Sequence, residues 1–472
     1  MALPRRDFLA AAPLLLTRRL SAAASKRNVL FIAIDDLNDW VGSLGGHPQA
    51  RTPNLDRFAA SGVNFTSAHC AAPLCNPSRA ALMTGLRPST TGVYQNTQPF
   101  RESARGRNAV TLTQHLMASG YKAIGSGKIY HGGFPDPQSW NDYFPDNRGR
   151  DVPPSPAPPK DKLPLNGIPR TAHFDWGPID NSDEDMGDYK VAQWVSEQLG
   201  KRYNDPMFIA CGMTRPHLPW YVPKKYFEMF PLDTIQLPAV RNDDLNDVPA
   251  AGVRMAKPDG DHAKVIEHGQ WKKAVQGYLA SIAFCDAMLG NVFRALELSP
   301  KAKETAVVLW SDHGWHLGEK LHWRKFSLWE RSTRNLLMMN IPGVTAARGR
   351  CARTVSLMDI YPTLIDVLGL PKRPELESQS LVSLLRNPSG PRKEPALTTY
   401  GKGNHTVRTE QWRYIRYNDG SEELYDHRSD PNEWTNLAAA PQHAPIKAEL
   451  AQWLPATDAP DAPTARERTA AG

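Results

Sequence analysis

Residues 28–36 read Asn-Val-Leu-Phe-Ile-Ala-Ile-Asp-Asp: an unbroken apolar run, rich in residues that favour β-strands, followed at once by two acids. A strand that is apolar on both faces belongs in the buried interior of a parallel sheet. Three further runs have the same character, at residues 207–211, 306–310 and 336–341. Between the runs lie patterns of helical periodicity, at roughly residues 54–61, 78–84, 112–119, 189–199, 274–296 and 357–368. Buried strands that alternate with helices predict a layered α/β domain.

The sequence pattern divides the 472-residue chain into four segments. Residues 28–390 carry the α/β pattern, and residues 391–455 carry short strand patterns that predict a small antiparallel subdomain. Residues 456–472 are rich in Ala, Pro, Thr and charged residues, which predicts a disordered tail. Residues 1–24 have the composition of a signal peptide rather than of a folded element.

The predicted signal peptide is of the twin-arginine type. Arg5 and Arg6 precede a short apolar run at residues 8–16, and small residues at 21–24 offer a cleavage site. An arginine-rich Sec signal is the alternative. The apolar run is too short to cross a membrane, which takes about 20 residues, and no later segment has the apolar composition of a membrane span. The sequence therefore predicts an exported protein, periplasmic or extracellular, without a membrane span.

The charge and cysteine content narrow the class of protein. The formal net charge is +7, and removal of residues 1–24, with four arginines and one aspartate, would leave +4. This mild excess suits an anionic substrate but is too diffuse to indicate nucleic-acid binding. Five cysteines occur without any Cys-x-x-Cys pair, which argues against a zinc or thiol-redox site.

Polar side chains follow two of the apolar runs. Asp35 and Asp36 come directly after the first, and Asp312 and His313 follow the run at residues 306–310. Ligands bind beyond the carboxyl ends of the strands in open α/β sheets, and three carboxylates gathered there would repel one another without a cation. Oxygen-rich ligation favours Ca²⁺ or Mg²⁺ over zinc. The alternative is that these residues are ordinary turn acids and helix caps.

Cys75 stands before a predicted helix. Asn76 is a good N-cap and Pro77 a good first helical residue, so Cys75 would lie where free N–H groups and the helix dipole favour anions. Arg79, one turn into the helix, adds positive charge, and a thiol in such a place is acidified. Taken alone, the pattern indicates a cysteine nucleophile, but no Asn/His pair typical of cysteine hydrolases accompanies it.

The segment from Cys75 to Gly85 resembles the signature of the formylglycine-dependent (type I) sulfatase family, Cys-x-Pro-Ser-Arg followed by a short helix ending in Thr-Gly. In that family the cysteine is oxidised after translation to formylglycine, an aldehyde that hydrates to a geminal diol. One hydroxyl of the diol can attack sulfur, and deprotonation of the other then expels sulfate, an exit that a thiolate lacks. The resemblance implies formylglycine derived from Cys75 and a formylglycine-generating enzyme as maturation partner.

The resemblance extends over nearly the whole mature chain. Matching segments lie at residues 28–37, 52–56, 61–65, 127–131, 215–217, 311–314, 423–426 and 430–433. Two variants, Lys128-x-x-His131 and Asp312-His313, resemble the branch that contains iduronate-2-sulfatase, as does the segment Gly314-Trp315-His316-Leu317-Gly318-Glu319. The resemblance implies an alkaline-phosphatase-like sandwich, with residues 28–390 as the catalytic domain around a large, mostly parallel sheet.

The resemblance also implies a metal centre. Ca²⁺ would be bound by Asp35, Asp36, Asp312 and His313, with the modified Cys75 completing the site. Such an ion lowers the pKa of the diol and holds a sulfate oxygen.

Five further residues acquire roles from the same resemblance. Arg79 would stabilise the diol or its alkoxide, and Lys128 and Lys325 would contact sulfate oxygens as negative charge shifts onto them. His217 is the candidate general acid for the leaving sugar oxygen, and His131 is the candidate partner of the diol and base for sulfate release. The alternatives are solvated surface lysines and a histidine that merely packs in a proline-rich turn.

The predicted activity is hydrolysis of sulfate monoesters on a sulfated sugar or oligosaccharide, such as a glycosaminoglycan fragment with a 2-O-sulfated uronate. The alternative enzyme is a phosphate or phosphonate monoester hydrolase of the same fold, because formylglycine can also attack phosphorus. A non-catalytic polysaccharide-binding protein is the alternative outside the enzymes. It predicts that site residues have been lost, whereas every motif position is filled.

Overall fold

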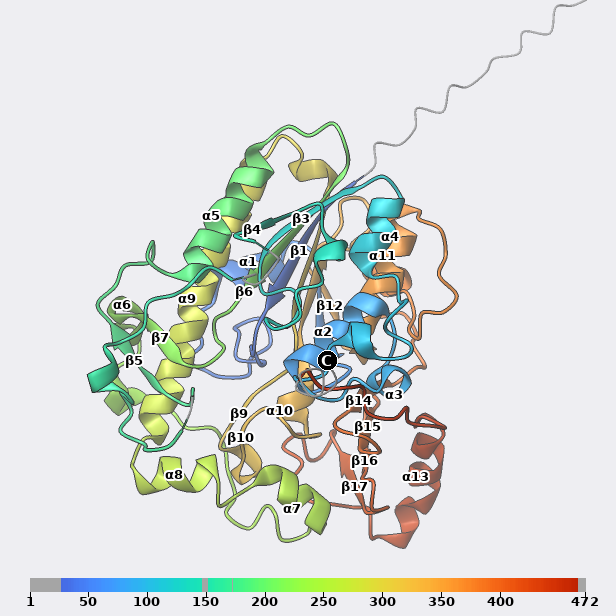
Figure 1. Cartoon of the computed structure of the whole chain (residues 1–472). Coiled ribbons are helices and arrows are strands. Elements are labelled where there is room, and N and C mark those ends of the chain that lie inside the picture. The colour runs from blue at the N-terminus through green and yellow to red at the C-terminus, as the bar shows by residue number, and fades with distance from the viewer. Residues whose placement is uncertain (1–26, 147–151, 172, 466–472) are drawn as a thin grey trace, which may run out of the picture.

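The computed structural model of the chain describes residues 27–146, 152–171 and 173–465 (Figure 1). The predicted signal peptide lies outside the described residues. A nine-stranded sheet forms the centre, in the order β12-β2-β11-β8-β1-β6-β3-β4, with β13 paired to β2. Its strands are β1 (Asn28–Ile34), β2 (Val63–His69), β3 (Lys122–Gly127), β4 (Asp142–Phe144), β6 (Met207–Met213), β8 (Thr305–Ser311), β11 (Arg334–Asn340), β12 (Gly349–Cys351) and β13 (Val355–Ser356).

The central sheet is mostly parallel, as the sequence predicts. Strand β1 pairs in parallel with β6 on one side and with β8 on the other, and residues Val29–Ile34 are fully buried. Only β11 runs antiparallel to both of its neighbours within the described sheet. Because β1, β6 and β8 are parallel, their carboxyl ends meet at one edge of the sheet.

Helices cover both faces of this sheet (Figure 1). Helices α1 (Pro53–Ala59), α5 (Gly187–Gly200) and α9 (Trp271–Leu298) pack over one face and share a hydrophobic core with Leu30, Ile32 and Ile34 of β1. The other face is covered by α2 (Cys75–Thr84), α4 (Leu112–Ala118) and α11 (Ile360–Leu368). Alternate apolar side chains of β1 therefore belong to two separate hydrophobic cores, one on each face of the sheet. The predicted layered α/β sandwich is confirmed.

Helix α9 departs from the sequence prediction in one respect. It is 28 residues long and apolar enough to cross a membrane, judged by length and composition only. No segment of this kind was expected from the sequence. The helix lies inside the protein instead, packed against α5, α1 and α6 (Lys224–Glu228). An apolar core helix of a large α/β protein needs the same composition as a spanning helix.

Shorter elements complete the main domain. The strands β5 (Trp176–Ile179) and β7 (Trp220–Pro223) pair in parallel, and β9 (His316–Leu317) pairs with β10 (Trp323–Arg324) in antiparallel fashion. The short helices are α3 (Pro88–Thr91), α7 (Ala250–Ala256), α8 (Asp261–Glu267), α10 (Glu330–Thr333) and α12 (Val382–Arg386).

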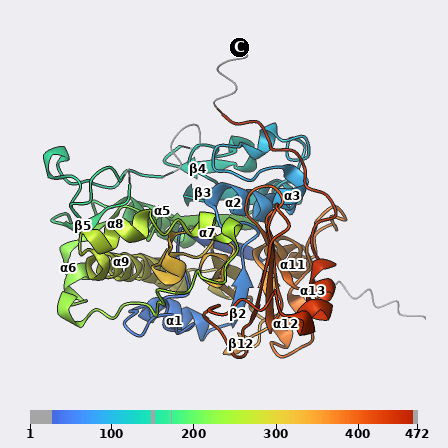
Figure 2. The same cartoon turned by 90° about the horizontal axis from the view of Figure 1, so that it is seen from below.

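The C-terminal region contains the predicted antiparallel sheet. Strands β14 (Ala396–Thr399), β15 (His405–Arg408), β16 (Trp412–Arg416) and β17 (Glu422–Asp426) pair in sequence order, and helix α13 (Ala444–Ala451) packs on β16. Figure 2 shows this sheet on the side of α11, away from α5 and α9.

The predicted disorder of residues 456–472 is wrong for the part that the structure describes. Residues 456–465 run along α3 and the segment that follows it to residue 97. The main-chain N–H groups of Ala459, Ala462 and Ala465 donate to carbonyls of residues 89–97 at 2.7–2.9 Å. Composition alone does not predict such hydrogen bonding. A proline-rich extended segment can bind through its backbone groups without an apolar pattern of its own.

Candidate active site

Two adjacent carboxylates share one pocket at the end of β1. The backbone of Asp36 adopts a left-handed conformation, with φ of 60°, which is uncommon outside glycine. Side chains of successive strand residues point to opposite faces, and this turn removes the alternation. The conformation is held because Asp36 N–H donates to Asp312 Oδ1 at 3.1 Å and its carbonyl accepts from the Tyr278 hydroxyl at 2.7 Å. Convergence of Asp35 and Asp36 at a turn is what the sequence predicts.

The end of β8 supplies two more groups. β8 pairs with β1 up to the Ile34–Ser311 position, so Asp312 and His313 emerge beside the two acids. His313 Nε2 lies 3.4 Å from Asp36 Oδ1 and 3.4 Å from Asp312 Oδ2. Three carboxylates and an imidazole therefore gather within one buried space.

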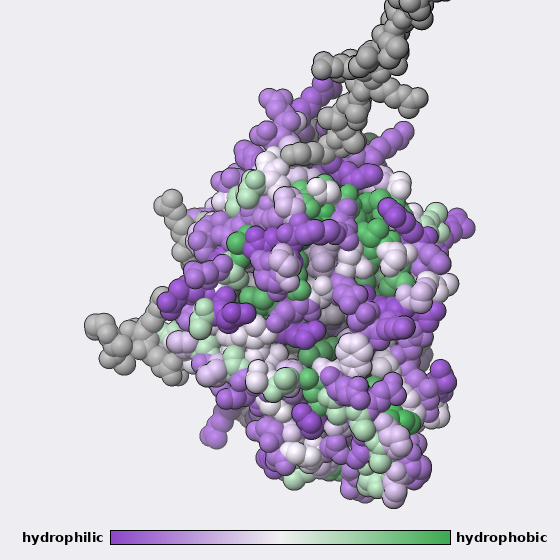
Figure 3. Space-filling model, turned by 90° about the vertical axis from the view of Figure 1, so that its right-hand side faces the viewer, coloured by the Kyte–Doolittle hydropathy of each residue, from purple (hydrophilic) through white to green (hydrophobic). Residues whose placement is uncertain are grey.

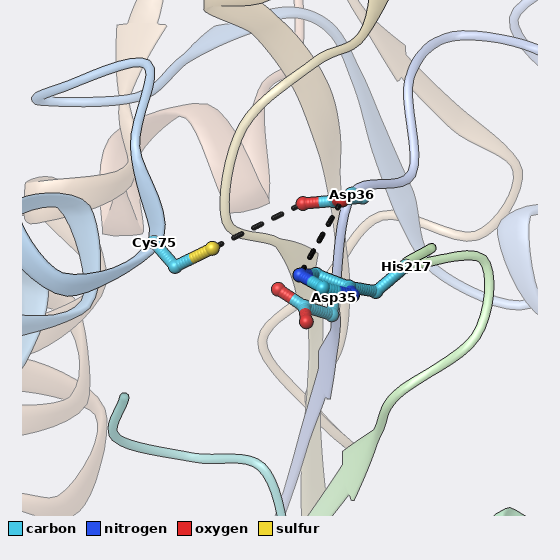
Figure 4. A group of neighbouring side chains, drawn as sticks. All are labelled: Asp35, Asp36, Cys75 and His217. Carbon is cyan, nitrogen blue, oxygen red and sulfur yellow. Dashed lines mark hydrogen bonds and ion pairs between the residues drawn. The ribbon is translucent and has the colours of Figure 1, made fainter. Parts of the chain in front are cut away.

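Cys75 enters this space from the start of α2. Its Sγ lies 3.4 Å from His313 Nε2. The same sulfur lies 4.0 Å from Asp36 Oδ1 (Figure 4). The helix begins two residues earlier than predicted: Leu74 is the N-cap, and Asn76 lies inside the first turn. Asn76 is not the capping residue, since its side-chain amide donates to the carbonyls of Gln95 and Gln98. Cys75 is thus the first helical residue, among N–H groups that the helix leaves free.

Arg79 ties the two strand ends to α2. Its Nε donates to Asp312 Oδ2 at 2.9 Å, and its Nη2 donates to Asp35 Oδ1 at 3.2 Å. Its Nη1 donates to the carbonyl of Ile129 at 3.1 Å. The guanidinium is fully buried, and the planar fork of arginine suits several fixed acceptors at once.

Lys128 and Lys325 both point into the site, so the alternative of solvated surface lysines is wrong. Lys128 Nζ bonds Asp35, and Lys325 Nζ lies 2.7 Å from Asp36 Oδ1 and 2.9 Å from Cys75 Sγ. Burial alone would raise the pKa of the Cys75 thiol, but Lys128 and Lys325 outweigh burial and lower it.

The two candidate histidines differ in position. His217 Nε2 lies 3.9 Å from Asp36 Oδ2, and its Nδ1 lies 2.5 Å from the carbonyl of Leu218. Burial and the charge of Lys128 lower the pKa of His131 to about 3, which places it near the lysine. His131 is half-buried, and its buried Nδ1 has no hydrogen-bond partner among the described residues.

The pocket has the composition of a cation site. Ligand atoms of Asp35, Cys75, Asp312 and His313 lie within 4.8 Å of one another. Asp36 Oδ2 is buried and has no hydrogen-bond partner in the part of the chain that the structure describes, and an unpaired buried carboxylate oxygen is costly. Burial, with the Asp35 charge beside it, raises the pKa of Asp36. A bound cation would pair with Asp36 Oδ2 and would favour the ionised form of the Asp36 carboxyl. The oxygen-rich donor set fits Ca²⁺ or Mg²⁺.

Two residues of the site escaped the sequence prediction. Tyr278 belongs to the apolar stripe of α9, yet its hydroxyl holds the Asp36 carbonyl and accepts from Asn38 N–H at 3.0 Å. Ser78 Oγ donates to the carbonyl of Asp312 at 2.6 Å. A hydroxyl on an otherwise apolar helix face was the only signal for Tyr278.

The fold and this site define an ester hydrolase of the alkaline-phosphatase-like class. Among sequence families, the sulfatase model matches residues 27–370, and the model named N-sulphoglucosamine sulphohydrolase, C-terminal, matches residues 318–459. The chain therefore belongs to the sulfatase family and is a sulfuric ester hydrolase.

Individual relatives agree with this assignment. A protein named sulfatase from Formosa agariphila is 42% identical over 439 residues, 89% of this chain and 85% of that protein. Iduronate 2-sulfatase of Mus musculus is 28% identical over 75% of this chain and 71% of its own length. The predicted resemblance to that branch is thus confirmed at lower identity.

Solved structures share the fold. A protein in complex with its substrate, D-glucosamine-2-N,6-O-disulfate, superposes with a TM-score of 0.73 at 19% identity, over 90% of this chain and 96% of that one. A phosphonate monoester hydrolase of Agrobacterium radiobacter superposes with a TM-score of 0.71 at 24% identity, over 90% and 94%.

Proposed function

We propose that the enzyme hydrolyses sulfate monoesters of sulfated carbohydrates, with Cys75 as the precursor of a formylglycine nucleophile beside a Ca²⁺ ion. One observation carries the proposal: Cys75 Sγ lies within 4 Å of Asp36, His313 and Lys325. The sulfur atom stands in for the oxygen of the modified residue. A nucleophile in this position faces the cation site and two ammonium groups at once.

The metal ligands we propose are Asp35, Asp36, Asp312 and His313, together with the modified Cys75. A bound Ca²⁺ ion would supply Lewis-acid polarisation of a sulfate oxygen. Arg79 holds Asp35 and Asp312 in place through its buried bonds to both.

Lys128 and Lys325 would receive the negative charge that moves onto the sulfate oxygens. Both amines already lie in the pocket, so no reorganisation is needed when the charge develops. The removal of one such donor typically costs about 100-fold to 1,000-fold in kcat.

His217 is our candidate for protonation of the leaving oxygen. Its Nδ1 donates to the Leu218 carbonyl at 2.5 Å, which fixes the ring. His217 protonates the leaving oxygen from its imidazolium form, in which Nε2 also carries a proton. Nε2 then points toward the Asp36 side of the pocket, and a third of the side chain is exposed to the space a substrate would enter. His131 is our candidate for the base that assists sulfate release.

The substrate class we infer is a sulfated glycosaminoglycan-like sugar, such as a 2-O-sulfated uronate. Its support is the similarity to iduronate 2-sulfatase and to a structure bound to a sulfated glucosamine. The rival is a phosphonate monoester hydrolase, which the second structural neighbour represents. A matched panel of nitrophenyl sulfate, phosphate and phenylphosphonate esters separates the two, and a preference for the phosphorus esters would reject the proposal.

Mass spectrometry of the peptide spanning residues 70–87 tests the nucleophile directly. Conversion of cysteine to formylglycine lowers the peptide mass by roughly 18 Da through oxidation of the β-carbon and loss of sulfur. Cys75→Ala should abolish turnover while the fold remains, and fully active enzyme with unmodified Cys75 would overturn the mechanism. A formylglycine-generating enzyme is the maturation partner that this modification requires.

We also infer export by the twin-arginine route, on the strength of Arg5, Arg6 and the short apolar run after them. Fractionation of cells that express the full chain, compared with an Arg5→Lys, Arg6→Lys variant, tests this. Equal export of both would contradict it.

A further inference from the structure

The C-terminal segment, residues 456–465, lies against α3 and the segment that follows it. Its backbone runs beside residues 89–97, with hydrogen bonds from Ala459 N–H to the Ser89 carbonyl at 2.7 Å and from Ala465 N–H to the Thr97 carbonyl at 2.9 Å. We name residues 456–465 the strap. Gly92 permits its close approach, since a Cβ there would lie 2.0 Å from the Pro460 carbonyl oxygen.

Three side chains of the rest of the protein bond the strap at residues 458–461. His405 Nε2 on β15 lies 3.1 Å from Asp458 Oδ2, which anchors the strap to the C-terminal sheet. The Tyr94 hydroxyl donates to the Ala459 carbonyl at 2.9 Å. In the middle of the strap, Gln98 Nε2 donates to Asp461 Oδ1 at 3.1 Å.

Gln98 is the link between the strap and the loop at residues 94–98. Its Oε1 accepts from the N–H groups of Tyr94 at 2.7 Å and Gln95 at 2.8 Å. The Gln98 side chain therefore closes the loop on itself, and the bond from its amide to Asp461 fixes the rotamer in which it can do so. Gln95 and Thr97, at the tip of the loop, are exposed, so apolar burial contributes little to the order of the tip.

The same loop holds the first turn of the nucleophile helix. Asn76 Nδ2 donates to the carbonyls of Gln95 at 2.9 Å and Gln98 at 2.6 Å, and Asn76 N–H donates to Asn96 Oδ1 at 2.9 Å. Asn76 directly follows Cys75. A continuous chain of hydrogen bonds thus runs from Asp461 through Gln98 to Asn76, the residue that follows Cys75 in the chain.

We propose that the strap is a positioning element for the active site, with Asp461 and Gln98 as positioning residues for Cys75. Neither residue is placed among the groups that contact substrate or metal. The strap fixes the conformation of the loop at residues 94–98, and the loop fixes the position of the first turn of α2. A misplacement of about 1 Å there costs on the order of 100-fold in rate. The inference rests on the proposed function for its kinetic consequence, but its structural part is independent of the reaction.

The closing experiment combines hydrogen-exchange mass spectrometry with kinetics on the full chain. Asp461→Ala removes the acceptor of the Gln98 amide, whereas Asp461→Asn keeps an oxygen in its place and is the matched control. We expect amide exchange at residues 94–98 to rise at least fivefold in Asp461→Ala, with exchange in β1 unchanged. We expect kcat/KM per formylglycine-containing molecule to fall about tenfold, the size of one lost charge-assisted hydrogen bond. Asp461→Asn should stay within about twofold of the native enzyme.

Two truncations give a second measure that does not depend on one side chain. Removal of residues 466–472 leaves the strap intact and should change neither exchange nor kcat/KM. Removal of residues 456–472 should exceed the effect of Asp461→Ala in both. Unchanged exchange at residues 94–98 in Asp461→Ala and in the longer truncation would reject the strap, and raised exchange with unchanged kcat/KM would reject its role in positioning. A native enzyme without activity on sulfate esters would refute the proposed function alone, since the exchange data would still decide whether the strap orders the loop.

Discussion

At Asp36 the chain leaves a buried strand in a conformation that few residues other than glycine adopt. Hydrogen bonds from Tyr278 and to Asp312 hold this conformation. It turns two neighbouring carboxylates toward one point. Strained backbone of this kind persists where the surrounding structure over-determines it, most often at active sites. The proposed cation site thus depends on a single backbone geometry as much as on the choice of acids.

The first residue-scale prediction concerns Lys325. Lys325→Ala removes the amine 2.9 Å from Cys75 Sγ, and kcat/KM toward a sulfate ester should fall about 100-fold because a preorganised cation is lost. Steady-state kinetics at equal formylglycine content measure this. Lys393→Ala, at an exposed lysine of the C-terminal region, is the control and should stay within twofold. Equal activity of the two variants would contradict the proposed catalytic role of Lys325.

The second residue-scale prediction concerns metal binding. Ca²⁺ added to chelator-treated enzyme should stabilise it against unfolding, by about 2.7 kcal/mol at 100 times Kd, because the ion satisfies Asp36 Oδ2. Asp36→Ala should lose most of this response, whereas Asp233→Ala, at an exposed acid, should keep it. Thermal unfolding with and without Ca²⁺ measures both. A full response in Asp36→Ala contradicts the site.

Residue identity could be predicted where a local motif carries it. Asp35, Asp36 and Cys75 stand at strand and helix ends that periodicity finds, and the structure brings them together. The partners of Asn76 could not be predicted in the same way. Its sequence context is that of an N-cap, and only the loop at residues 95–98, placed by tertiary contacts, draws its side chain away.

At the scale of elements, α1 has an unusual cap. Its N-cap residue, Thr52, makes no side-chain capping bond. The free N–H groups of Asn54 and Leu55 donate instead to the carboxylate of Asp286 on α9, at 3.2 and 2.8 Å. A carboxylate from another helix therefore does the work of a local cap and joins two helices of the same layer.

The element-scale prediction follows from this cap. Asp286→Ala leaves the two N–H groups unpaired and should lower the free energy of unfolding by about 1–3 kcal/mol. Glu297→Ala, at an exposed position on the same helix, is the control and should change it by no more than about 0.5 kcal/mol. Chemical denaturation of both variants is the measurement, and a loss equal to that of the control would show that the cap is not needed.

The elements themselves were largely predictable. Strand β1 matches its predicted bounds, and β6 and β8 extend the predicted runs by only two residues or fewer at each end. Strand β3, Lys-Ala-Ile-Gly-Ser-Gly, lies outside the predicted strands because two glycines and a serine interrupt its apolar pattern. Yet β3 delivers Lys128, so a strand without a clear pattern positions a group of the site.

At the scale of the whole molecule, buried ion pairs join the C-terminal sheet to the catalytic domain. Glu330 on α10 accepts from Arg408 Nε at 3.1 Å and also bonds Arg413, while Arg413 bonds Glu433. His427 Nε2 lies 2.9 Å from Glu433 Oε1. Sequence patterns predict the strands that carry these charges but not their partners, because the pairs span up to 83 residues and form only after the two parts dock.

The last prediction concerns acid stability and belongs to this junction. Burial alone would raise the pKa of Glu433, but Arg413 and His427 outweigh burial and lower it to about 2. The folded-state pKa thus lies below the unfolded value, so ionised Glu433 stabilises the fold above about pH 4.5 and this contribution is lost as the pH falls toward 2. The stabilisation is on the order of 2–3 kcal/mol.

Glu433→Gln should therefore lower the free energy of unfolding at pH 7 and flatten its decline between pH 4.5 and 2. Gln keeps the size of the side chain but cannot hold the charge that faces Arg413 and His427. Glu449→Gln, at an exposed acid on α13, is the matched control and should leave both the value at pH 7 and the acid slope unchanged. Denaturant unfolding across this pH range measures the two curves. Parallel acid declines for native enzyme and Glu433→Gln would mean that the junction draws its acid sensitivity from other carboxylates, because the difference between the curves reports the proton that Glu433 binds on unfolding.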